Sequence, residues 1–89
     1  MKATFLLQDI FHIIGVGVIF AGEVKSGVID LNSRVFLGDK NYSVSGIEAK
    51  NQKVHQAQTG QNVGIALAGA NDKKIFNHFK GQIITFINN

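Results

Sequence analysis

The chain has 89 residues, including ten glycines, no proline and no cysteine, and a formal net charge of +3. This length allows one thin hydrophobic core, so we expect residues 1–89 to form a single domain. The lack of cysteine excludes disulfides, thiolate metal sites and thiol nucleophiles, and the mild basic charge is only a weak indication of a nucleic-acid or acidic protein partner.

The N-terminal segment is apolar but interrupted. Lys2 precedes an apolar run, as in a signal peptide, but Gln8, Asp9 and His12 break that run. A secretory segment needs about 7 to 15 uninterrupted apolar residues, and a membrane-spanning helix needs about 20. We therefore expect no membrane segment and a cytoplasmic protein.

Short segments rich in β-branched and aromatic residues alternate with turn-forming residues along the chain, which predicts an all-β sandwich or barrel. Strands are expected over residues 3–12, 17–25, 33–38, 42–50, 53–57, 62–68 and 82–87. Residues 72–79 form the one helix-like segment. There Asp72 would cap a single turn, and Ile75, Phe76 and Phe79 would share one face.

The strand expected over 17–25 is apolar on both faces where it begins. Val18 and Phe20 alternate with Ile19, and a small barrel has only one interior to fill. We expect Val18 and Phe20 to lie inside and Ile19 outside. The same alternation predicts an outer apolar patch of Phe11, Ile13, Ile19, Ala21 and Ala66. Apolar residues exposed together in this way usually mark a contact site for a ligand or another domain.

The glycines of GVGVIFAG at residues 15–22 do not form a nucleotide-binding motif. The third glycine of the dinucleotide fingerprint and the Gly-Lys-Ser/Thr ending of a Walker A loop are missing, and no helix is expected to follow. We expect Gly15 and Gly17 to form a tight hairpin or bulge. Gly22 would allow close packing or a sharp bend.

The titratable residues give no catalytic or metal-binding pattern. His12, His55 and His78 share no ligand spacing, so no metal site is expected. Asp9 and Glu48 leave a carboxylate pair open, although acids on strand edges usually face solvent. We assign no catalytic residue and no cofactor.

Four glycine-containing segments together resemble domain 2 of the translational GTPases, as in elongation factor Tu. The segments are DIFHIIGVG at 9–17, GEVKSGVI at 22–29, GIE at 46–48 and GQNVGIALAG at 60–69. The resemblance covers about residues 5–86. It implies a small closed antiparallel β-barrel of six to seven strands.

The resemblance also implies a binding site. In the elongation factor Tu branch, an outer pocket of this domain holds the terminal adenosine and the aminoacyl group of charged tRNA. Carried over by position, that pocket is formed by Gln8, Asp9, Phe11, Ile13, Ile19, Ala21, Glu48, Lys50, Asn62 and Ala66. This set largely coincides with the outer patch predicted from alternation.

The chain departs from the family pattern at several positions. The arginine between the first two glycines is Val16, the threonine of the next strand is Ala21, and two Gly-Asp pairs are replaced by Asn32-Ser33 and Gly81-Gln82. The implied pocket is thus more apolar and lacks a nearby basic residue. The P-loop lysine and the magnesium-binding serine or threonine of a GTPase are absent from the sequence, so we expect no GTP hydrolysis by this chain alone.

Two function hypotheses follow. The first is a non-enzymatic binding module of the translation elongation factor type. It would contact RNA, either the tRNA acceptor end or the ribosome, through the outer patch, beside a protein partner such as a separate GTPase domain. The alternative is a protein-interaction or self-association module that uses the same patch to form an oligomer. Neither hypothesis involves a membrane or a small-molecule substrate.

Overall fold

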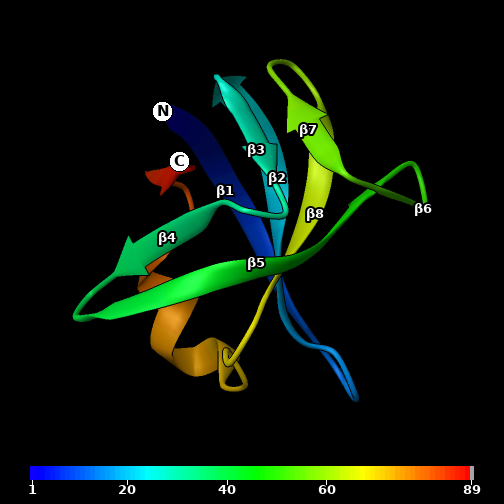
Figure 1. The fold of residues 1–89 in the computed structure, drawn as a ribbon. Coiled ribbons are helices and arrows are strands. Elements are labelled where there is room, and N and C mark those ends of the chain that lie inside the picture. Colours follow the sequence, from blue (N-terminus) through cyan, green and yellow to red (C-terminus); the bar gives the residue numbers. More distant parts are fainter. Residues whose placement is uncertain (89) are drawn as a thin grey trace.

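Six antiparallel strands close into a barrel in the computed structural model, which describes residues 1–88 (Figure 1). The elements are β1 (Lys2–Ile13), β2 (Gly17–Ser26), β3 (Val28–Asp30), β4 (Arg34–Leu37), β5 (Lys40–Ala49), β6 (Gln52–Val54), β7 (Gln56–Gln58), β8 (Asn62–Leu67), the 3-10 helix η1 (Lys73–Phe79) and β9 (Ile83–Ile87). The barrel order is β4-β9-β1-β2-β8-β5, and the pairing of β4 with β5 closes it. This confirms the predicted all-β barrel.

The remaining strands lie outside the closed ring. β6 pairs with β5 at the end of the sheet, and β3 pairs with β7 in a separate two-stranded sheet. The segment predicted as one strand over 53–57 is therefore two short strands that belong to different sheets, with His55 between them. β3 was not predicted because three residues are too few to show a period-2 pattern.

The β1–β2 hairpin is closed by a tight turn. The backbone N–H of Val16 donates to the carbonyl of Ile13 at 3.0 Å. Gly15 and Gly17 have φ angles of +85° and +107°, a region that side chains with a Cβ rarely adopt. The predicted hairpin at these glycines is confirmed.

A bulge interrupts the pairing of β1 with β2. Leu7 pairs with Gly22 and Asp9 with Ala21, so β1 has one residue more than β2 at this point. A Cβ at Gly22 would run into the carbonyl oxygen of Leu6. The close backbone approach that the sequence predicted at Gly22 is confirmed. The bulge also changes which way the side chains of β1 point.

The core follows the predicted alternation of β2, and β8 alternates in the same way. Val18 and Phe20 are fully buried, and Val63, Ile65 and Leu67 on β8 are buried with them. The largest fully buried side chains are Phe5, Phe20, Phe76 and Phe86. Four aromatic rings thus fill much of the narrow interior of the barrel.

η1 closes one end of the barrel, at the bottom of Figure 1. The ring of Phe76 packs edge-to-face against Phe20 and Tyr42, with ring centres 5.4 and 5.3 Å apart. Asp72 caps η1 as predicted, because its carboxylate accepts a hydrogen bond from the backbone N–H of Lys74 at 3.0 Å. The expectation that Ile75 shares the buried face was wrong, and its side chain is 50% exposed. A 3-10 helix has three residues per turn, so only residues spaced by three lie above one another.

The two ends of the described chain meet at the opposite end of the barrel. The N-terminal amine of Met1 donates to the carbonyl of Asn88 at 2.7 Å. Within residues 1–88, no helix has the length and apolar character needed to cross a membrane.

Candidate functional site

Two adjoining hollows lie on the outer surface where β1, β2, β8 and β5 run side by side. Their volumes are about 440 and 410 Å³. We call them the apolar hollow and the polar hollow. Both are lined by Ile13, Ile19, Glu48 and Gly64, so they form one continuous face of the barrel.

The strand register explains why this face is hollow. Ile19 on β2 pairs with Ala66 on β8, and Ala66 pairs with Gly46 on β5. In the next row, Ala21 pairs with Gly64, and Gly64 pairs with Glu48. Because side chains directly opposite each other on one face are neighbours, small residues on β8 and β5 leave space between larger ones on either side.

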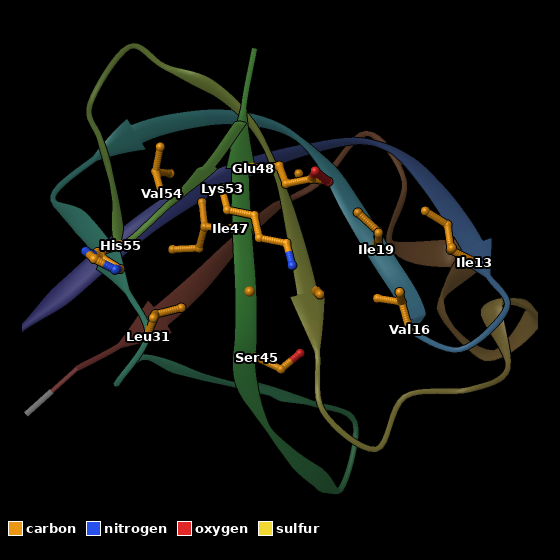
Figure 2. Close-up of a pocket in the computed structure, with 13 residues that line it drawn as sticks. Ile13, Val16, Ile19, Leu31, Ser45, Ile47, Glu48, Lys53, Val54 and His55 are labelled. Atoms are coloured by element: carbon orange, nitrogen blue, oxygen red, sulfur yellow. The ribbon is translucent and has the colours of Figure 1, made fainter. Parts of the chain in front are cut away.

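The apolar hollow has aliphatic walls on both sides of β5 and β8 (Figure 2). Figure 2 shows Ile13, Val16 and Ile19 on one side, and Leu31, Val54 and His55 on the other. Glu48, Lys53 and Ser45 supply polar groups between these two sides. The hollow can therefore hold an apolar or flat group and offer hydrogen bonds around it.

The polar hollow is rimmed by the turn between β5 and β6. Lys50 and Asn51 line it and have φ angles of +53° and +64°. Two successive residues with positive φ are typical of the two-residue turns that match the twist of a hairpin. Lysine is uncommon in this region of backbone space. Gln8 and Phe11 from β1 and Asn62 from β8 also line this hollow.

Most of the predicted site residues lie together. Eight of the ten line the polar hollow: Gln8, Phe11, Ile13, Ile19, Ala21, Glu48, Lys50 and Asn62. Phe11 and Ile13 are about half exposed, at 49% and 45%. Ala66 lines the apolar hollow but is only 8% exposed. Its small side chain lies between Ile19 and β5, so it forms a floor and not an exposed patch.

Asp9 lines neither hollow. Its carboxylate accepts a hydrogen bond from the backbone N–H of Ile10 at 2.8 Å and lies 3.3 Å from the Nζ of Lys80. The pKa of Asp9 is lowered most by the hydrogen bond from Ile10 and next by the hydrogen bond from Lys80. The charges of Lys80 and Lys73 lower this pKa further. The bulge in β1 thus turns Asp9 towards the residues that follow η1. Asp9 and Glu48 do not share a hollow, and no acid–base pair is formed by them.

Several lining residues were not predicted from the sequence: Leu31, Ser45, Lys53, Val54 and His55. The short gap between the strands expected over 42–50 and 53–57 could have revealed Lys53 and Val54, because the β5–β6 hairpin pairs them with Glu48 and Ile47. Leu31 follows the unpredicted β3 and carries no pattern of its own. Among residues 1–88, no group of three or more His, Asp or Glu side chains is arranged to hold a metal ion.

Comparison with known proteins identifies relatives of this barrel. No protein-family model matches the chain. Elongation factor 1-alpha of Pyrobaculum calidifontis is 35% identical over 71 residues, and elongation factor Tu of the Theileria parva apicoplast is 37% identical over 67 residues. These matches cover 78% and 71% of this chain. The apo structure of translation elongation factor SelB from Methanococcus maripaludis has a TM-score of 0.75 at 25% identity and covers 96% of this chain.

The chain is homologous to part of these elongation factors, and its closed barrel fits domain 2 of elongation factor Tu. It spans 16% of the length of those two relatives and 18% of the SelB chain. The correspondence is thus to one barrel of a much larger protein. The resemblance that the glycine-containing segments indicated is confirmed, and the homology supports a translation-factor module.

Proposed function

We propose that this elongation-factor barrel is a non-enzymatic, cytoplasmic RNA-binding module that uses the face formed by the two hollows. The RNA is the acceptor end of a tRNA or a segment of the ribosome, and a GTPase domain is the protein partner that would supply nucleotide hydrolysis. The observation that carries the proposal is the group of small residues on β5 and β8, Gly46, Gly64 and Ala66, which opens an apolar floor beside a polar rim.

The chemistry of the face suits an unpaired nucleotide. The half-exposed ring of Phe11 offers a surface for stacking a base, which is the usual way that proteins bind single-stranded RNA. Gln8 and Asn62 on the rim can both donate and accept hydrogen bonds. Glu48 lies between the hollows and can accept a hydrogen bond from a ribose hydroxyl.

The departures from the family pattern change the expected source of affinity. Val16 is 53% exposed at the edge of the apolar hollow, where a family member would carry arginine. Ala21 lines the polar hollow without a hydroxyl. Burial of an apolar group and base stacking, and not a phosphate contact, would therefore dominate binding at this face.

Self-association is the second candidate. The tip of the β1–β2 hairpin exposes Ile14 at 92% and Val16 at 53%. Exposed aliphatic residues next to an apolar hollow are also typical of a protein interface. In this case two copies of the chain would bury the hairpin tip.

One experiment separates the two candidates. Light scattering measures the molar mass while a short single-stranded RNA ending in CCA is titrated into the protein at several salt concentrations. We expect a monomer that binds the RNA, and about tenfold weaker binding by Ile19→Lys, since a charge would enter the shared wall of both hollows. A stable dimer that ignores RNA would overturn the proposal.

Ile83→Lys is the matched control. Ile83 is 59% exposed on β9 and lines neither hollow. The same change of charge is therefore introduced away from the proposed face. We expect Ile83→Lys to bind RNA like the wild type, and equal losses in both variants would contradict the location of the site.

A further inference from the structure

Three lysines are gathered around η1. Residues 72–80 contain Lys73, Lys74 and Lys80, all exposed, with Asp72 as the one acidic residue of that segment. η1 is held in place by the buried ring of Phe76, which is only 1% exposed. The lysines therefore extend from an anchored element at the end of the barrel. We call Lys73, Lys74 and Lys80 the lysine strip.

Two members of the lysine strip, Lys73 and Lys80, lie near the residues that border the polar hollow. The residues after η1 are bonded to β1, because the N–H of Gly81 donates to the carbonyl of Leu7 at 2.7 Å and the N–H of Leu7 donates to Gln82 at 3.0 Å. This places Lys80 beside the bulge, where it pairs with Asp9. Lys73 is also close enough for its charge to act on Asp9. Gln8, the neighbour of Asp9 on β1, lines the polar hollow.

The hollow and the lysine strip differ in charge. The charged residues that line the polar hollow are Glu48 and Lys50, one of each sign, so the hollow has little net attraction for a polyanion. The lysine strip has an excess of positive charge. Proteins that hold single-stranded nucleic acid combine two such parts. One is a surface on which bases stack, and the other is a row of cations that follows it.

We propose that the lysine strip binds the phosphate backbone of the RNA whose unpaired end occupies the hollows, so that the strand crosses the β1 bulge. This inference rests on the proposed function and adds the direction of the strand. Charge complementarity selects a polyanion. The exposed ring of Phe11 and the amides of the adjoining hollow favour RNA over an acidic protein, since they match bases and ribose.

Asp9 has a defined part in this arrangement. Its carboxylate holds Lys80 and repels phosphates at the point where the strand would cross. Asp9→Asn removes that charge, so Lys80 is free to contact the phosphate backbone of the RNA. We expect Asp9→Asn to bind RNA more tightly than the wild type, by about two- to threefold at low salt.

The test compares two double variants with the same change of charge. Lys73→Glu with Lys74→Glu alters the lysine strip, and Lys2→Glu with Lys25→Glu alters the other end of the barrel, where β1 begins and β2 ends. The probes are a fluorescent 12-residue single-stranded RNA and a poly-glutamate peptide. Binding is measured by anisotropy from low to high salt, and circular dichroism checks that each variant is folded.

Each phosphate contact on single-stranded nucleic acid contributes about −0.7 to the slope of log affinity against log salt. We expect the lysine-strip variant to lose about 1.4 of that slope and to bind about tenfold more weakly, while the control changes the slope by less than about 0.5. If the lysine-strip variant does not fold, Lys73→Ala with Lys74→Ala takes its place, with the same slope expected.

The outcomes distinguish the two proposals. Equal slopes for the lysine-strip variant and the wild type overturn the lysine strip, while loss of binding in Ile19→Lys would still support the hollows. Tight binding of poly-glutamate that depends on Lys73 and Lys74 overturns it in favour of an acidic protein partner. A wild-type chain that does not bind RNA at all overturns both proposals.

Discussion

The two faces of β2 have opposite roles. On the inner face, Val18, Phe20 and Val24 are fully buried. On the outer face, Ile19 and Ala21 are apolar as well but only half-buried, and their neighbours on β8 are small. Packing inside the barrel accounts for the inner residues, whereas Ile19 faces the two hollows and packs over Gly64 and its neighbours on β8. An apolar outer face next to hollows supports the binding role that we propose.

The largest expected effect is the loss of stability caused by a substitution on the inner face of β2. Phe20→Ala removes a ring that contacts Phe76, and we expect it to lower the free energy of unfolding by about 3–5 kcal/mol. Small domains have about 5–15 kcal/mol in total, so much of the chain would unfold. Ile19→Ala should lower it by about 1 kcal/mol, since its side chain is half-buried. Urea denaturation measures the free energy of unfolding of both variants. Equal losses of stability in Phe20→Ala and Ile19→Ala would contradict the assignment of the inner and outer faces.

A pair of glycine variants sharpens the comparison. Gly22→Ala places a methyl group against the carbonyl of Leu6 and 3.0 Å from the ring of Phe5, and should destabilise the protein by about 1–3 kcal/mol. At Gly46 the nearest atom to an added Cβ is that of Ala66, at 3.9 Å. Gly46→Ala should leave stability unchanged or raise it by about 0.5 kcal/mol.

Gly46→Ala has a second consequence. The methyl group would enter the apolar hollow, because Gly46 lines it. We expect weaker binding of RNA in a protein of normal stability, as measured by titration and thermal unfolding together. Unchanged RNA binding would indicate that the apolar hollow is not part of the site.

The smallest expected effect concerns Asp9, at the bulge in β1. The pKa of Asp9 is lowered from its ordinary value of 3.8 by the Ile10 N–H and by Lys80. A lowered pKa in the folded state adds stability above pH 3.8, and this contribution is lost as the pH falls through the lowered pKa. In Asp9→Asn this part of the loss of stability at acidic pH should be absent. An unchanged pH profile would show that the ion pair does not affect stability.

The sequence was sufficient for most of the fold because its signals are local. Period-2 alternation identified the inner and outer sides of β2, and Gly15 and Gly17 identified the hairpin. The short strands β3 and β7 depend on a pairing between distant segments and leave no local pattern. The face of η1 was missed because periodicity does not distinguish a 3-10 helix from an α-helix over seven residues.

The candidate site was predictable where it follows strand alternation and the family pattern. The direction of Asp9 was not predictable, since it depends on a bulge and on Lys80, which is distant in sequence. The far wall of the apolar hollow, with Leu31 and His55, depends on how loops after β3 and β6 fold over the barrel. Alternation describes single strands and cannot report such contacts.

The most direct test of the proposed RNA-binding face is an NMR titration of the isoleucine methyl groups with the CCA-ending single-stranded RNA. Ile13 and Ile19 line both hollows, and Ile83 is an exposed isoleucine outside them. We predict that the signals of Ile13 and Ile19 shift together as RNA is added, while that of Ile83 stays unchanged. Shifts confined to Ile83, or no shift at saturating RNA, would contradict the proposal.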